Sequence, residues 1–162
     1  MSNDLQKEFY KACQLGNLTL VKRLVEEERV DPTADKNFAI RKAASNGRLD
    51  VVEFLMTLDD VDPTDCDNYA IYQTTMNGYL DVVKYLLVFP CVNLTIDYNW
   101  LLECAVIKGH LHIVKYFVDV KDVDPTYDNN IAIRWATKFK QYDVADYLLT
   151  LPCINPSTKF SS

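Results

Sequence analysis

The sequence predicts an all-α solenoid of five stacked helix pairs joined by short connectors. A four-residue pattern recurs at a fixed interval of 31 residues, and the segments between its copies align with one another. Repeats of this length form solenoids, because one helix pair is too small to bury its own apolar side and needs a neighbour. The pattern starts at Val30, Val61, Val92, Val123 and Ile154.

The repeated units extend over nearly the whole chain, which we therefore expect to form a single domain over residues 1–162. NFAIRKAASNGRLDVVEFLM at 37–56 aligns with NYAIYQTTMNGYLDVVKYLL at 68–87 and NWLLECAVIKGHLHIVKYFV at 99–118. The opening residues and residues 130–149 are looser copies. We place the units at approximately 4–33, 34–64, 65–95, 96–126 and 127–157, followed by a tail at 158–162.

The first half of each unit is predicted to be a short helix with a defined start and end. An asparagine stands before it in four units, at the place of an N-cap. A glycine follows it in four units and is expected to take the left-handed conformation that ends a helix. The asparagines are Asn37, Asn68, Asn99 and Asn130, and the glycines are Gly16, Gly47, Gly78 and Gly109.

The second half of each unit is predicted to be an amphipathic helix that ends in a connector. In the second unit, apolar residues at 49, 51, 52, 55 and 56 form a helical stripe. The connector VDPT follows. We expect its valine to be a buried anchor, and its proline to keep the segment extended and to stop the helix. The prolines are Pro32, Pro63 and Pro125.

Two features predict how the units stack and where the stack ends. The second position of the first helix is Ala39, Ala70, Leu101 or Ala132, mostly small, as close packing between neighbours requires. The first unit has Glu8 there, and the last unit replaces the glycine by Lys140. We expect both ends to be polar caps of a complete array.

These residues carry a resemblance to a known family. AASNGRLDVVEFL, TTMNGYLDVVKYL and AVIKGHLHIVKYF resemble the A-A-x-x-G-H-L-x-V-V-x-x-L-L stretch of ankyrin repeats, over residues of about 4–157. Ankyrin units usually have about 33 residues, and the family's T-P-L-H opening is replaced here by F-A-I-R and Y-A-I-Y. This shorter variety is associated with protists and large DNA viruses. The short connector leaves a tight turn and a β-hairpin as alternatives.

The resemblance implies a function as well as a fold. It implies a curved stack that binds other proteins on a concave surface of first helices and connector tips, without catalysis. We therefore predict a non-catalytic protein-binding module that is a monomer and takes no cofactor. The alternative is a structural protein that associates with itself through the same surface.

Composition excludes several other classes. The net charge is −6 and no basic surface stands out, so we expect no nucleic-acid partner. No apolar run is long enough to span a membrane. Five cysteines without a C-x-x-C pair predict free thiols in a reducing compartment. The predicted location is the cytoplasm, with the nucleus as the alternative.

No residue set predicts catalysis or a metal site. The two histidines, His110 and His112, flank one leucine on a single turn, and we expect them to be structural. The acidic stretch DDVDPTDCD at 59–67 is interrupted by Pro63 and lacks the glycine of a calcium loop. Cys66 occupies a connector position held elsewhere by aspartate, and a neutral substitution is favoured there over a reactive thiol.

Aromatic residues on the helices leave two interpretations open. Phe54, Tyr85, Tyr116 and Tyr147 recur at the same place in the second helix. We interpret this ladder as packing between units rather than as a platform for stacked bases. Trp135 fits equally well as a core residue at the end of the stack and as a contact residue.

Binding residues are predicted at positions that differ between units, because positions that maintain the fold must repeat. The connector tips and the last turns of the first helices vary most, and their apolar and aromatic members lie in the middle and later units. If the connectors lean over the first helices, these residues form one patch rimmed by two aspartates. We expect the partner of this patch to have a basic or mixed surface. The alternative is a set of singly exposed side chains. We also expect alanine at Tyr98 and Tyr127 to weaken binding with little change in melting temperature. The predicted residues are Asp65, Asp67, Met76, Ile96, Tyr98, Ile107, Tyr127 and Asn129.

Overall fold

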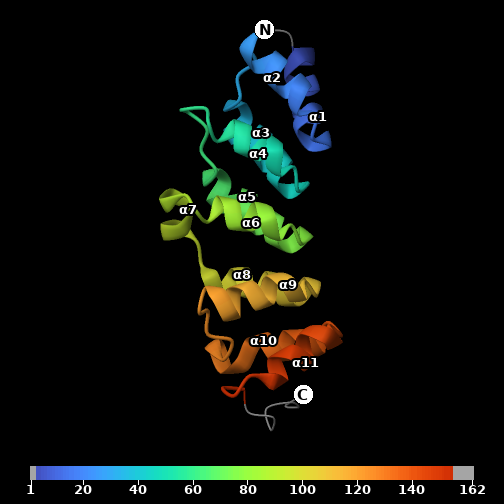
Figure 1. Ribbon diagram of the computed structural model, residues 1–162, viewed down its shortest axis with the longest axis vertical. Helices are drawn as coiled ribbons and strands as arrows, with labels where there is room; N and C mark the ends of the chain where they lie inside the picture. Colours follow the sequence, from blue (N-terminus) through green and yellow to red (C-terminus); the bar gives the residue numbers. More distant parts are fainter. Residues whose placement is uncertain (1–2, 155–162) are drawn as a thin grey trace. The chain divides into compact units, whose positions relative to one another are not determined.

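The computed structural model describes residues 3–154, and the regular elements of this part of the chain are all helices (Figure 1). The chain divides into two compact units, Met1–Ile96 and Asp97–Ser162. The predicted all-α fold of helix pairs is therefore confirmed. The prediction of a single domain over 1–162 stays a prediction, and the predicted tail at 158–162 lies outside the described residues.

The unit Met1–Ile96 contains three helix pairs and one additional short helix. The first helices α1, α3 and α5 pack on one another in order, and so do the second helices α2, α4 and α6 (Figure 1). The unit thus has two helical layers. The bounds are α1 Asn3–Leu15, α2 Leu18–Glu26, α3 Ala34–Ser45, α4 Leu49–Leu55, α5 Asp65–Asn77, α6 Leu80–Leu86 and α7 Pro90–Thr95.

The unit Asp97–Ser162 contains two helix pairs in the same arrangement. The first helix α8 packs on α10, and the second helix α9 packs on α11. The second helix of the fourth pair continues from α9 into a π-helical turn, η1, which buries Phe117 completely. The bounds are α8 Tyr98–Lys108, α9 Leu111–Lys115, η1 Tyr116–Val120, α10 Tyr127–Lys138 and α11 Tyr142–Thr150.

The repeated apolar positions form the core, as predicted. The anchors that begin each connector are between 0% and 8% exposed in all five copies. At the small position, Ala39, Ala70 and Leu101 are completely buried, whereas Glu8 is exposed in the first helix. The same residue types recur because each pair buries the same surface against the next.

The first helices end as the glycines predict. Gly47 has φ +67° and Gly109 has φ +73°, and the next residue donates its backbone N–H to the carbonyl five residues earlier. This is the arrangement of a Schellman motif, in which a left-handed residue closes the last turn. In the fifth pair Lys140 adopts the same conformation, with φ +58°, although it has a side chain.

The first, second and fourth connectors are tight turns, not the extended segments or β-hairpins that the sequence also allows. The Asp62 carboxylate accepts hydrogen bonds from the backbone N–H and hydroxyl of Thr64, at 2.8 and 2.7 Å. Asp31 with Thr33 and Asp124 with Thr126 form the same pair of bonds. An aspartate that bonds the residue two positions ahead forms a turn by itself, which explains why Asp-Pro-Thr repeats.

The asparagines before the first helices are not N-caps, contrary to the prediction. Asn37, Asn68 and Asn130 are each the third of three successive residues with positive φ, and Asn37 has φ +53°. In the fourth pair Asp97 caps the helix instead, accepting from the backbone N–H of Asn99. Asparagine tolerates the left-handed conformation better than most residues do.

The side chain of Asn37 joins two successive connectors. Its Oδ1 accepts the Asp62 backbone N–H at 3.0 Å, and its Nδ2 donates to the Asp65 carboxylate at 2.9 Å. Asn68 makes the equivalent contact with Thr95, whose hydroxyl donates to Asn68 Oδ1 at 3.1 Å. Asn37 and Asn68 therefore stabilise the stacking of units rather than the start of a helix.

The third connector differs from the others because its sequence does. Asn93 and Leu94 replace Asp and Pro of the pattern VDPT, and this segment forms the short helix α7. Without a proline at position 94, the backbone N–H groups can continue a helical turn. Val92 remains completely buried, whereas Leu94 is 82% exposed.

The connector turns predict a dependence of stability on pH. The hydroxyl and backbone N–H of Thr126 lower the pKa of Asp124 from its ordinary value of 3.8. A carboxylate with a depressed pKa in the folded state stabilises the protein above that ordinary value, and this contribution is lost as pH falls through the folded pKa. We expect Thr126→Val to lower the free energy of unfolding at neutral pH, with a deficit that shrinks in acid.

Urea denaturation at a series of pH values measures this deficit. Thr137→Val is the control, because the Thr137 hydroxyl donates to the Ile133 carbonyl, a group that does not titrate. Its deficit should stay constant with pH. If the loss in free energy of unfolding had the same pH dependence in both variants, the Asp124 carboxylate would not stabilise the turn in a pH-dependent way.

Candidate functional site

Aromatic side chains and an arginine form a continuous row across the first helices of Met1–Ile96. We call Tyr10, Phe38, Arg41 and Tyr69 the aromatic–arginine row. The rings of Tyr10 and Phe38 meet edge to face with centroids 4.8 Å apart. The Arg41 guanidinium lies 5.2 Å from the Phe38 centroid and 5.5 Å from that of Tyr69. The row therefore connects α1, α3 and α5.

The row is held in position by hydrogen bonds to the left-handed residues in the first turn of α3. Arg41 donates from Nε to the Lys36 carbonyl at 3.0 Å and from Nη2 to the Asp35 carbonyl at 2.7 Å. The Tyr10 hydroxyl donates to the Asp35 carboxylate at 2.8 Å, and burial followed by this bond raises the pKa of Tyr10 to about 12. Tyr69 remains 42% exposed. A fixed and partly exposed aromatic surface of this kind favours binding, because little side-chain freedom is left to lose.

Four of the predicted binding residues lie in Met1–Ile96, at two ends of one helix. Asp67 is exposed at the start of α5, and Ile96 follows Thr95, whose hydroxyl donates to Asn68 in the same turn of α5. Met76 is half-buried in the last turn. Asp65 is engaged by Asn37, which lowers the pKa of its carboxyl group. These residues do not form one cluster within this unit, and Tyr69 lies between them along α5.

The other four predicted residues lie in Asp97–Ser162. Tyr127 and Asn129 are exposed in the first turn of α10, and Tyr127 is 50% exposed. The Tyr98 ring is half-buried, with its centroid 6.2 Å from that of Phe117. Ile107 is half-buried at the other end of α8, and its carbonyl accepts from Gln141 Nε2 at 2.9 Å. We therefore keep only for Tyr127 the expectation that replacement by alanine changes the melting temperature little.

The sequence analysis missed two exposed aromatic residues of the first helices. The position that reads Lys7, Phe38, Tyr69, Trp100 and Ile131 was not among the predicted binding positions. Tyr69 is 42% and Trp100 is 47% exposed. Its variation from unit to unit was the available signal, and the same criterion had selected the other binding positions.

Comparison with protein-family models gives a result for most of the chain. A model described as Ankyrin repeats (3 copies) matches residues 9–99 and 71–159. The chain belongs to the ankyrin-repeat family. Ankyrin repeats are generally protein–protein interaction modules, and ankyrin-repeat proteins are typically non-catalytic. A search of curated proteins returned no match.

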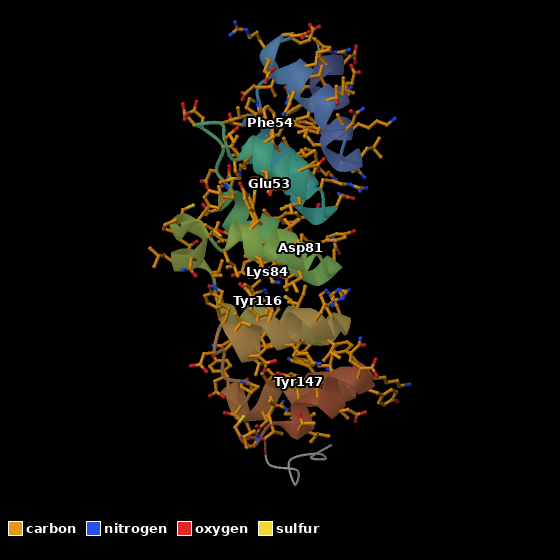
Figure 2. The ribbon with its side chains drawn as sticks, viewed as in Figure 1. Glu53, Phe54, Asp81, Lys84, Tyr116 and Tyr147 are labelled. Atoms are coloured by element: carbon orange, nitrogen blue, oxygen red, sulfur yellow. The ribbon has the colours of Figure 1, made fainter. Side chains whose placement is uncertain are left out.

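The second helices of this ankyrin-repeat chain carry the aromatic ladder, some of whose members are labelled in Figure 2. Lys22 of α2 lies 5.5 Å from the centroid of Phe54 in α4, and Lys115 lies 5.3 Å from that of Tyr147 in α11. The Tyr147 hydroxyl also donates to the Asp119 carboxylate at 2.6 Å. These contacts join neighbouring ankyrin units, so the ladder contributes to packing at Phe54 and Tyr147 as predicted.

The described part of this ankyrin-repeat chain contains little that resembles a reaction centre. No group of three or more His, Cys, Asp or Glu side chains within it could hold a metal ion. Burial raises the pKa of the Cys13 thiol to about 12 and that of Cys104 to about 11, which keeps both protonated at neutral pH.

Trp135 donates from Nε1 to the Glu103 carboxylate at 3.1 Å and thereby connects α10 to α8. None of the described helices is long and apolar enough to cross a membrane.

Proposed function

We propose that this chain is a non-catalytic module that binds a protein partner with its first helices and connector tips. The partly exposed aromatic–arginine row is the observation that carries the proposal. Aromatic residues and arginine dominate the energy of protein interfaces, especially where their positions are fixed before binding. Within Met1–Ile96 the proposed binding residues are Tyr69 and the sequence-predicted Asp65, Asp67, Met76 and Ile96. Within Asp97–Ser162 they are Trp100 and the sequence-predicted Tyr98, Ile107, Tyr127 and Asn129.

The proposed setting is a monomer in the cytoplasm. All five cysteines are free thiols, and Cys91 and Cys153 are exposed. Exposed free thiols are typical of a reducing compartment. Light scattering over a range of concentrations tests the monomer, and a mass that rises with concentration would favour self-association through the same surface.

Selection from a random peptide display library tests the proposed binding surface and requires no identified partner. We expect selected peptides to lose affinity by about tenfold or more with Tyr69→Ala or Tyr127→Ala. Tyr142→Ala is the matched control, since Tyr142 is 68% exposed but begins the second helix α11. Peptides that respond only to Tyr142→Ala, or to none of the three, would contradict the proposal.

A further inference from the structure

The first helices α1 and α3 carry a group of basic side chains, although the protein as a whole is acidic. The net charge of the chain is −6. Lys7 and Lys11 of α1 are exposed, and they occupy the repeat positions that Phe38 and Lys42 hold in α3. Together with Arg41 they form what we call the basic set, consisting of Lys7, Lys11, Arg41 and Lys42.

The basic set and the aromatic row are one surface. Lys42 Nζ lies 5.0 Å from the Phe38 centroid, and the Arg41 guanidinium lies between Phe38 and Tyr69. The Asp35 carboxylate accepts the Tyr10 hydroxyl, whereas Arg41 donates to the backbone carbonyl of Asp35. A ligand on the rings therefore also meets the cationic groups.

Arg41 is prepared to bind a carboxylate. Its Nε and one Nη2 hydrogen are used by the carbonyls of Lys36 and Asp35, which fixes the plane of the guanidinium. Its Nη1 donates no hydrogen bond to the residues that the structure describes. Guanidinium N–H groups match carboxylate oxygens in geometry, and a fixed side chain loses little entropy on binding.

The surrounding charge selects among anionic partners. Acidic residues stand at the starts of these helices: Asp31 in the first connector, Asp35 in the first turn of α3, and Asp65 and Asp67 in the first turn of α5. These carboxylates repel a continuous polyanion such as a nucleic-acid backbone, whose binding depends on neutralising many phosphates. A peptide with separate carboxylates and apolar side chains can satisfy the basic set while its apolar groups cover Phe38 and Tyr69.

We propose that the basic set and the aromatic–arginine row bind an acidic peptide segment of a partner protein, in which carboxylate side chains alternate with apolar ones. The proposal rests on the proposed function and gives the chemistry of the partner at that surface. It differs from the prediction of a basic or mixed partner surface, which was based on Asp65 and Asp67 alone.

Fluorescence anisotropy with defined peptides tests this proposal. The probe is a short fluorescein-labelled peptide of alternating glutamate and leucine, and the comparison probe has lysine in place of glutamate. We expect the glutamate probe to bind, and Lys11→Glu with Lys42→Glu to weaken its binding about tenfold. Arg23→Glu with Lys84→Glu is the control, because it changes the net charge equally on second helices and should leave binding within about twofold.

The outcomes separate this inference from the proposed function. Equal binding of the lysine probe, an unchanged affinity of the Lys11→Glu/Lys42→Glu variant, or tighter binding of a single-stranded oligonucleotide would overturn the acidic-peptide assignment. Library peptides that depend on Tyr69 but are basic would do the same while leaving the proposed function intact. If the charge-reversed variant fails to fold, amide chemical shifts of the unaltered protein decide. Changes in α1, α3 and α5 support the proposal, and changes elsewhere refute it.

Discussion

Replacing Gly47 with alanine is expected to lower the free energy of unfolding by about 2–4 kcal/mol. Two effects add. Gly47 has φ +67°, where a residue with a Cβ is strained. A Cβ at this position would also lie 2.7 Å from two carbons of the Tyr79 ring, which belongs to the next helix pair. These carbons lie near the base of the side chain, so the ring cannot move aside without leaving its rotamer.

Two further substitutions separate strain from contact. Gly16 has φ +80°, but a Cβ there would meet Cδ of the flexible Arg48 side chain at 2.9 Å, so Gly16→Ala should cost only about 1 kcal/mol. Lys140→Gly relieves the same strain in the fifth pair and should stabilise by about 0.5–1 kcal/mol. Urea denaturation followed by circular dichroism measures all three. Equal losses for Gly16→Ala and Gly47→Ala would show that the Tyr79 contact is unimportant.

Replacing Asn37 with alanine is expected to cost about 2–4 kcal/mol. Asn37 is 6% exposed, and its amide bonds both the Asp62 backbone N–H and the Asp65 carboxylate. Alanine leaves the Asp62 N–H without this partner in a partly buried site. It also places a Cβ-bearing residue with no local polar partner at φ +53°.

Asn37→Gly distinguishes the two contributions. Glycine accepts the left-handed conformation and removes only the amide contacts, so its loss should be about 1–2 kcal/mol. A double-mutant cycle with Asp65→Ala then measures the coupling between Asn37 and Asp65. A loss indistinguishable from zero for Asn37→Gly would mean that the asparagine is retained only for its backbone conformation.

The candidate site shows the limit of inference from one sequence. Tyr127 and Asn129 were correctly expected on an exposed connector, because variable positions in a turn have few packing partners. Tyr98 belongs to the same class by position, yet its ring packs against Phe117. In the fourth unit Asp97 caps the start of α8, at the place where Asn37, Asn68 and Asn130 have left-handed conformations in other units. The binding role of Tyr98 stays a prediction.

The sequence by itself determined the five helix pairs, the left-handed glycines, the buried valine anchors and the small residues between first helices. Each of these follows from helical periodicity or backbone sterics within one unit, and the repeat displays it several times. Only the tertiary structure decided the partners of side chains in neighbouring units. Asn37 meets a connector 25 residues away, and Arg41 lies between rings of two helices. Such contacts depend on the offset between stacked units, which no local pattern in the chain encodes.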